Sequence, residues 1–259
     1  MGKKKKKVPR KILGVDIGGS GIKGAPVHTK KGILLEERHR IPTPQPATPK
    51  AVAETMRQVM EAHGWKKALG CTVPGRVVRG IVQTAANIDD SWIGTDAQKL
   101  FSDTCGVPVA VLNDADAAGL AEMTFGAGKG ANGTVLLLTF GTGIGSALFT
   151  DGHLVPNTEF GHIKFDKRIA EHVAADSIRS KEHLSWERWA KKRVRPVLAM
   201  YEFILSPDLI IVGGGVSRPD RWEQFGKFLD TKARIVPAAL GNEAGIVGAA
   251  LAARRMLKG

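Results

Sequence analysis

A glycine-rich strand–turn–strand unit occurs twice in the chain and constrains the fold more than any other feature. The first copy, ILGVDIGGSGIKGAPV, begins at Ile12, and the second, TVLLLTFGTGIGSALF, begins at Thr134. In each copy an apolar run ends in a turn rich in glycine, and a second strand follows. Two such units predict a duplicated α/β architecture whose two halves flank a cleft.

Helical segments lie between the strands, as this fold class requires. Thr48 is placed to cap a helix that begins with Pro49 and stops at Gly64. Thr95 and Gln98 have the spacing of a capping box for a second helix.

Two further helices are expected in the second half of the chain. A long helix is predicted from Ser185 to about Leu205, and Pro196 should kink it or start a new segment. A terminal helix follows, for which Asn242 is the expected cap.

We place the domain boundary near Val111–Asn113. Residues 1–11 are then a basic disordered tail, residues 12–112 a small N-terminal α/β domain, and residues 113–243 a large C-terminal α/β domain. The terminal helix, about 244–259, is expected to pack on the first domain, which would otherwise lack a covering helix.

Composition narrows the class of protein. A chain of 259 residues that is 43% hydrophobic can bury one large core or two medium ones. Its apolar runs are shorter than the ~20 residues of a membrane span, and its N-terminus does not have the pattern of a signal peptide. The two cysteines, Cys71 and Cys105, form no CxxC pair, so a cysteine-rich zinc site is excluded and a reduced cytoplasmic protein fits best.

The net charge of +13 indicates an anionic partner. The run from Lys3 to Lys11 supplies seven of these charges and is typical of a solvated tail, which leaves six for the rest of the chain. Nucleic acid is the weaker choice of partner, because no helix-turn-helix, zinc-finger or RNP-like pattern is present. A second basic run, from Lys164 to Arg195, is either a solvated face or an extended anion track.

Glycine clusters are candidates for binding phosphate, because glycine lets backbone N–H groups converge on an anion. Three of them recur, at Gly18-Gly19-Ser20-Gly21, Gly141-Thr142-Gly143 and Gly213-Gly214-Gly215. None has the Walker pattern or a GxGxxG that opens a helix. Each alone is consistent with a plain hairpin, but three together favour phosphate.

Acidic and imidazole side chains provide the other candidates. Asp114 follows Asn113 at an expected strand end, where it is either a ligand-facing carboxylate or a helix N-cap. Glu159 and His162, in the stretch EFGH, suit a sugar-binding platform or a loop brace.

In order along the chain, these motifs resemble the ROK family of sugar kinases. The resemblance rests on Asp16-Ile17-Gly18-Gly19, Pro74-Gly75, Asn87, Asn113-Asp114, Gly141-Thr142-Gly143 and Glu159-Phe160-Gly161-His162. It implies a duplicated ribonuclease H-like fold of the actin-like, hexokinase type, with two domains around a cleft. No cysteine follows Cys105, so the zinc loop of many members is absent and no zinc is expected. Four segments are similar to those of members that phosphorylate glucose with inorganic polyphosphate: DIGGSGIKGA, FGTGIGSALF, LSWERWAKK and PAALGNEAGIVGAA.

The resemblance also implies roles for individual residues. Asp114 would be the general base that takes the proton of the glucose 6-hydroxyl. Other sugar hydroxyls would be held by Asn87, Asn113, Glu159, His162 and, as the candidate for a further acid, Glu171. The phosphoryl donor would contact Asp16, Gly18, Gly19, Ser20, Gly21, Gly141, Thr142, Gly143, Gly214 and Gly215. Asp16 would hold Mg2+ through water, and Lys23 either touches phosphate or is a surface residue.

The leading hypothesis is therefore a cytoplasmic, Mg2+-dependent glucokinase that uses polyphosphate, with ATP as a second donor. The expected partners are glucose, polyphosphate and a second copy of the chain in a homodimer, with neither nucleic acid nor membrane. The main alternative is an ATP-dependent glucose or mannose kinase of the same family. A sugar-responsive regulator and an inactive sugar-binding module are hypotheses from other classes.

Overall fold

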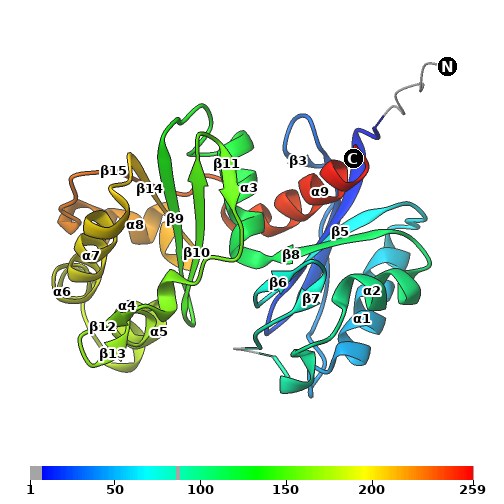
Figure 1. Cartoon of the computed structure of the whole chain (residues 1–259), viewed down its shortest axis with the longest axis horizontal. Helices are drawn as coiled ribbons and strands as arrows, with labels where there is room; N and C mark the ends of the chain where they lie inside the picture. Colours follow the sequence, from blue (N-terminus) through cyan, green and yellow to red (C-terminus); the bar gives the residue numbers. More distant parts are fainter. Residues whose placement is uncertain (1–7, 86–87, 259) are drawn as a thin grey trace. The chain divides into compact units, whose positions relative to one another are not determined.

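The chain divides into two compact units. The computed structural model describes residues 8–85 and 88–258 (Figure 1). Unit 1 runs to Ala121 and includes the chain from Glu243 onward, and unit 2 is Glu122–Asn242. The division falls within helix α3 (Asp114–Phe125) rather than before it, because α3 follows strand β8 (Val109–Asn113) without a loop.

Unit 1 is built on a mixed sheet with the strand order β3-β2-β1-β5-β8, and β4 pairs with β2. β1, β5 and β8 are parallel, whereas β2 is antiparallel to β1. The remaining strands of the unit are β1 (Lys11–Ile17), β2 (Ile22–His28), β3 (Ile33–Leu34), β4 (His39–Ile41), β5 (Leu69–Val73), β6 (Val77–Val78) and β7 (Ile81–Val82). The segment between Ile33 and Ile41 thus forms two short strands, β3 and β4.

Helices cover both faces of this sheet. Side chains alternate between the faces of a strand, so Leu13 and Val15 of β1 point toward α1 (Pro49–Ala62), with which they share a core. On the other face, α9 (Ala244–Met256) lies against Gly14 of β1 and Gly70 of β5, where a Cβ would overlap the helix backbone. The two glycines thus let α9 approach the sheet closely.

The caps of the unit 1 helices only partly follow the sequence predictions. Thr48 caps α1 through the N–H of Ala51, as expected. The expected capping box is wrong: Asp96 caps α2 (Ala97–Cys105) at 2.8 Å from the N–H of Lys99. The hydroxyl of Thr95 instead donates to the carbonyl of Ser91, which lies in the short 3-10 turn η1 (Asp90–Trp92).

Unit 2 has a sheet of its own, with five strands in the order β11-β10-β9-β14-β15. β9 is antiparallel to β10 and parallel to β14, so this sheet repeats the strand directions of β2, β1 and β5 in unit 1. Its strands are β9 (Thr134–Phe140), β10 (Ile144–Thr150), β11 (His153–Val155), β14 (Leu209–Gly213) and β15 (Arg234–Pro237), and β12 (Lys164–Phe165) and β13 (Arg168–Ile169) form a separate hairpin.

One face of the second sheet packs on a layer of helices that share its core. The centre of this core includes Leu138, Phe140, Trp189, Tyr201 and Val212, all of them fully or almost fully buried. The helical elements of the unit are η2 (Phe160–His162), α4 (Glu171–Ala174), α5 (Asp176–Lys181), α6 (Trp186–Trp189), η3 (Ala190–Val194), α7 (Arg195–Leu205), η4 (Gly215–Ser217), α8 (Pro219–Phe225) and η5 (Gly226–Phe228).

The long helix expected from Ser185 is present as three consecutive elements. Ser185 caps α6 through the N–H of Arg188, and Pro196 lies at the start of α7, with the π-helical turn η3 between them. The expected cap of α9 is wrong, because Asn242 belongs to the 3-10 turn η6 (Gly241–Glu243) and Glu243 precedes the helix without a side-chain cap. No helix in the part of the chain described is long and apolar enough to span a membrane.

Candidate active site

Asp16 lies at the carboxyl edge of the parallel strands in unit 1, where ligands of open α/β sheets bind. One of its carboxylate oxygens accepts a hydrogen bond from the Thr72 hydroxyl at 2.8 Å, and the other lies 3.1 Å from the Lys23 ammonium nitrogen. Gly245 of α9 approaches so closely that a Cβ would lie 2.7 Å from the carboxyl carbon of Asp16. Lys23 is therefore paired with Asp16 and is not a free surface residue.

The turn Gly18–Gly21 is a closed hairpin between β1 and β2. The N–H of Gly18 donates to the carbonyl of Gly21 at 3.1 Å, and the Thr43 hydroxyl donates to the carbonyl of Gly18 at 2.5 Å. The N–H groups of Gly19 and Ser20 have no partner among the described residues, and both residues are exposed. The tip of the turn can therefore donate to an anion, whereas the N–H of Gly18 already stabilises the turn.

Arg40 is a cation at this turn that the sequence reasoning missed. Its guanidinium donates to the carbonyl of Ser20 at 2.9 Å, and Arg40 lies opposite Lys23 in the β2–β4 pair. Only the strand pairing reveals it, because β4 is short and its pattern in the sequence is not distinctive.

Asn113 and Asp114 have separate roles at the junction of β8 and α3. The side-chain oxygen of Asn113 accepts from the N–H of Asp116 at 3.0 Å, which is the bond of a helix N-cap. Its amide nitrogen donates to the carbonyl of Gly75 at 3.0 Å, so Asn113 is buried and bonded within the protein. Asp114 begins α3 with an exposed side chain, one oxygen of which accepts from the N–H of Ala115 at 2.8 Å. The cap alternative for Asp114 therefore applies to Asn113 instead.

The turn Gly141–Gly143 of unit 2 is closed in the same way as the turn Gly18–Gly21 of unit 1. The N–H of Gly141 donates to the carbonyl of Gly143 at 3.0 Å, just as Gly18 closes the first turn. Ser177 of α5 fixes the turn from outside: its N–H donates to the carbonyl of Gly141, and its hydroxyl donates to that of Thr142 at 2.7 Å. Gly141 and Thr142 are exposed at the tip.

Glu159, His162 and Glu171 form one polar group in unit 2. Nδ1 of His162 lies 3.2 Å from a carboxylate oxygen of Glu159, and Nε2 lies 3.4 Å from one of Glu171. The other oxygen of Glu171 accepts from the N–H of Ile144 at 3.3 Å, and it occupies the space that a Cβ on Gly143 would need. Glu171 therefore links the imidazole to the glycine turn.

The backbone of η2 holds this group against the sheet. A Cβ on Gly161 would overlap the carbonyl of Ile144, and the Phe160 N–H donates to the Ser146 hydroxyl at 3.0 Å. The Tyr201 hydroxyl donates to the carbonyl of Phe160 at 2.7 Å. Burial, together with the charge of Glu171, raises the pKa of Tyr201 above its usual range, so the phenol stays protonated and remains a donor.

Gly213–Gly215 ends the strand that lies beside β9. Gly213 is paired with Thr139, so this turn and Gly141–Gly143 emerge at the same edge of the sheet. Gly214 has φ +83°, and a Cβ there would press on the backbone of Phe140, so glycine is required for both reasons. Gly214 and Gly215 are exposed.

Two of the expected features lie outside the described residues: Asn87, assigned to the sugar, and the lysine run at Lys3–Lys7. No cluster of three or more histidine, cysteine or acidic side chains that could ligate a metal occurs in residues 8–85 and 88–258. Asp16 nevertheless fits Mg2+, which commonly keeps several waters and takes one or two carboxylates together with substrate phosphates. Its half-buried carboxylate at the strand edge matches that kind of donor set.

The fold is that of the ROK sugar kinases. The ROK family model matches residues 12–177, and the chain belongs to the ROK family.

Similar proteins are known from several bacteria. The polyphosphate glucokinase of Mycobacterium tuberculosis is 51% identical over 242 residues, covering 93% of this chain and 90% of that protein. The inorganic polyphosphate/ATP-glucomannokinase of Arthrobacter sp. strain KM has a structure similar to this one, with a TM-score of 0.91 and 47% identity over 96% of this chain and 100% of that chain. A ROK family glucokinase of Streptomyces griseus, in complex with glucose and AMPPNP, gives a TM-score of 0.78 and 26% identity over 95% and 99%.

Proposed function

We propose that this protein phosphorylates glucose at the 6-hydroxyl and takes the phosphoryl group from inorganic polyphosphate. The observation that carries the proposal is the 51% identity to a polyphosphate glucokinase across 93% of this chain. The basic surplus of the chain supports a polyanionic donor.

Asp114 is the proposed general base. Its carboxylate is exposed at the start of α3, and Asn113 supplies the cap that the helix needs. A carboxylate that is ionised at neutral pH can accept the hydroxyl proton as the oxygen attacks, as the catalytic aspartate of protein kinases does. Phosphoryl transfer otherwise depends on positioning and charge stabilisation.

Glu159 and His162 are proposed to hold other hydroxyls of the sugar, with Glu171 beside them. The three side chains present acceptors and an imidazole donor within one group, which suits the paired hydroxyls of a hexose. Asn87 and Asn113 remain sugar-binding predictions, and Asn113 would act through its backbone or its second amide hydrogen, because its other polar groups are bonded.

The N–H groups at the two turn tips are the proposed donors to the phosphates. Gly19 and Ser20 provide them in unit 1, and Thr142 and Gly143 in unit 2, while Gly18, Gly21 and Gly141 shape the turns. Lys23 and Arg40 add positive charge at the first turn. Gly214 and Gly215 are proposed to contact the donor from the neighbouring strand end.

Mg2+ is the proposed metal, held by Asp16 through water. When bound, it would neutralise charge on the phosphates during transfer. The Thr72 hydroxyl and the Lys23 ammonium orient the Asp16 carboxylate for this contact.

The like order and directions of the two sheets support the finer fold assignment, a duplicated ribonuclease H-like fold of the actin-like, hexokinase type. The free, buried state of Cys71 and Cys105 supports a cytoplasmic location. The homodimer and the absence of nucleic-acid and membrane partners remain predictions.

ATP is the proposed second donor, and mannose a second acceptor, because a glucomannokinase that uses polyphosphate and ATP is 47% identical. Initial rates with purified protein should be compared for long-chain polyphosphate and ATP, each with glucose and with mannose. Polyphosphate should give the higher kcat/KM, and its rate should fall more steeply with salt. Turnover with ATP but none with polyphosphate would instead identify an ATP-dependent glucose or mannose kinase.

A further inference from the structure

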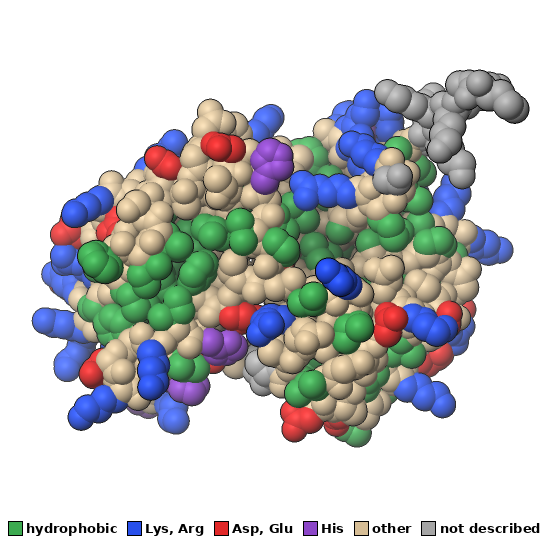
Figure 2. Space-filling model, in the orientation of Figure 1, with side chains coloured by type: hydrophobic (Ala, Val, Ile, Leu, Met, Phe, Trp, Pro, Cys, Tyr) green, Lys and Arg blue, Asp and Glu red, His purple; other side chains and the backbone are tan. Residues whose placement is uncertain are grey.

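A basic surface lies on the helical layer of unit 2 and takes no part in the site described above. Four cations occur within six residues, at Arg188, Lys191, Lys192 and Arg193. Lys191 pairs with Glu187 at 2.6 Å, and Arg193 pairs with Glu182 at 2.5 Å. Arg188 and Lys192 have no ion pair within the described chain. Figure 2 shows Lys and Arg side chains gathered at the edge of the unit that carries α6 and α7.

Pro196 accounts for the π-helical turn on which three of these cations lie. Proline has no N–H, and its ring crowds the carbonyl four residues earlier, which here belongs to Lys192. The chain accommodates it with the π-helical turn η3, in which the N–H of Arg195 donates to the carbonyl of Ala190, five residues back. Lys191, Lys192 and Arg193 all lie within this turn, and π turns often occur at functional sites.

An aromatic cluster holds this segment rigidly. Trp189 is completely buried and packs edge-on against Phe225, while Trp186 stacks on the same ring at 5.6 Å. The guanidinium of Arg179 lies 3.8 Å above the ring of Trp186. This packing therefore fixes the backbone that carries the cations of η3.

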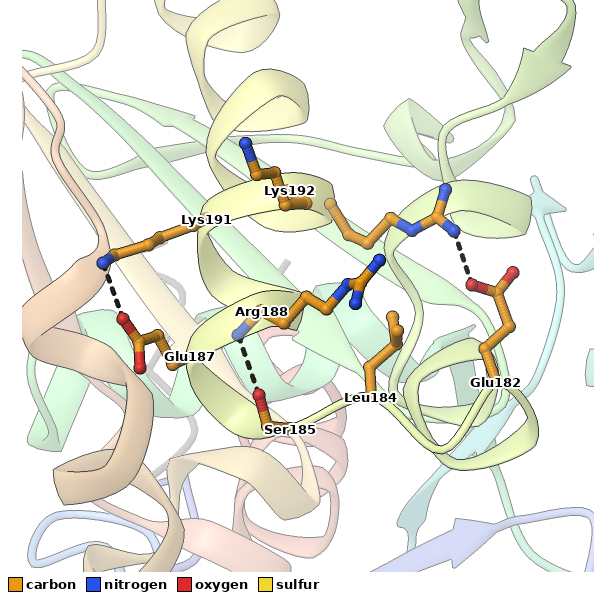
Figure 3. Close-up of a pocket in the computed structure, with 8 residues that line it drawn as sticks. Glu182, Leu184, Ser185, Glu187, Arg188, Lys191 and Lys192 are labelled. Atoms are coloured by element: carbon orange, nitrogen blue, oxygen red, sulfur yellow. Dashed lines mark hydrogen bonds and ion pairs between the residues drawn. The ribbon is translucent and has the colours of Figure 1, made fainter.

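The cations surround a pocket of about 650 Å³ (Figure 3). Figure 3 shows Arg188 extending toward Leu184 and Glu182, whereas Lys191 and Glu187 lie on the other flank of the helix. The lining is Glu182, Leu184, Ser185, Glu187, Arg188, Lys191, Lys192 and Arg193. Its one apolar side chain, Leu184, cannot form a slot for a nucleobase, so the pocket suits a chain of phosphates.

Helix α5 connects this pocket to the glycine turn of the same unit. Ser177, near its start, holds Gly141 and Thr142, and Glu182, directly after its end, lines the pocket. The six residues of α5 span about 9 Å. A polymer whose end lies at the turn can therefore reach the pocket with phosphates farther along the chain.

We propose that this pocket binds the distal phosphates of a polyphosphate chain whose terminal phosphate is at the Gly141–Gly143 turn. The inference rests on the proposed function and adds a second contact region for the same donor. Arg188 and Lys192, which are unpaired in the described structure, supply the charge, and Ser185 and Arg193 border it. Long chains gain these contacts, whereas short chains and ATP are too short to do so.

The test compares the double variant Arg188→Gln/Lys192→Gln with Lys66→Gln/Lys67→Gln, which removes two exposed charges from unit 1. Binding of long-chain and tripolyphosphate is measured by calorimetry, and transfer to glucose is measured with both donors and ATP. The pocket variant should bind long chains about tenfold more weakly and with a smaller salt dependence. Tripolyphosphate binding and ATP turnover should not change, and the control should match the wild type throughout.

Equal long-chain affinity in the pocket variant and the wild type would overturn the inference, as would an equal loss in the control variant. These outcomes leave the proposed function intact, provided that the wild type transfers phosphate from the polymer. If the wild type binds long chains through the pocket and transfers none, the proposed function fails and the pocket stands. Thermal unfolding of both variants identifies any loss that comes from misfolding.

Discussion

The ammonium nitrogen of Lys23 lies 3.1 Å from the carboxylate of Asp16, directly across the antiparallel pair of β1 and β2. The same carboxylate accepts from Thr72 and faces the start of α9 at Gly245. Lys23 thus balances the charge of Asp16, the proposed Mg2+-binding residue.

Lys23→Met is expected to raise the KM for the phosphoryl donor about tenfold and leave the KM for glucose unchanged, because it removes one charge-assisted contact. Steady-state kinetics with each substrate varied in turn measure both constants. Lys30→Met, an exposed lysine beyond β2, is the matched control. An unchanged donor KM would limit Lys23 to orienting Asp16.

Asp114→Asn is expected to lower kcat by about 10³-fold, a typical contribution of general-base catalysis. Glucose binding, followed by calorimetry, and the melting temperature should both persist, because Asn113 and not Asp114 caps α3. Asn113→Ala provides the contrast: losing the cap should cost about 1 kcal/mol of stability. Retention of wild-type turnover by the Asp114 variant would eliminate it as the base.

Glu171→Gln should raise the KM for glucose about tenfold, because the charge facing His162 is lost. The melting temperature should hardly change, since an amide oxygen can still accept from the N–H of Ile144. Glu223→Gln, an exposed residue of α8, serves as the control. If the variant unfolds more easily with an unchanged KM, Glu171 is a brace for the turn and does not act on the sugar.

Gly14→Ala is expected to destabilise unit 1 by about 3 kcal/mol, because the new Cβ would overlap the carbonyl of Ile246 in α9. Gly141→Ala is the control for stability alone, since its Cβ would meet no atom within 4 Å. Guanidinium unfolding measures both. A small effect at Gly14 would mean that α9 can move away from the sheet without penalty.

Stability should fall as the pH rises above about 9, because folding buries two thiols in protonated form. Burial raises the pKa of Cys105 from 9.0 to about 11, and it raises the pKa of Cys71 well above 9.0. A raised pKa means that the folded state binds the proton more tightly, so stability is full below pH 9 and is lost as the thiols ionise. Between pH 8 and 10 the loss should be roughly 3 kcal/mol for the two thiols together. The variant Cys71→Ala/Cys105→Ala should show a shallower pH dependence in guanidinium unfolding, and an identical one would refute the assignment.

The strands and glycine turns were predictable because their signals are local. The repeat of apolar run, glycine turn and second strand is visible within sixteen letters, and both copies form the expected hairpins. Thr48 likewise caps α1 through a bond only three residues away. The cap of α2 was missed because Thr95 and Asp96 compete at its start, and only the backbone geometry selects between them. At α9 the expected cap Asn242 lies in a 3-10 turn, and the helix begins without a side-chain cap.

Contacts distant in sequence were beyond such reasoning. The pairing of Arg40 with the first glycine turn depends on the strand order, and the bond between Glu171 and Ile144 joins residues 27 positions apart. Buried Glu122 is a further case: its carboxylate accepts from the N–H groups of Ala127, Ala239 and Leu240. Nothing in the local pattern around Glu122 distinguishes it from an ordinary helix surface residue.

The position of α9 has a consequence for biosynthesis. The ribosome makes the strands of unit 1 first, then all of unit 2, and only afterwards the helix that covers Gly14 and Gly70. Unit 2 is continuous in the chain and can complete its core while the sheet of unit 1 still exposes one apolar face. During translation the first half to emerge is therefore the last to finish folding, and that face is the surface that a chaperone would have to shield.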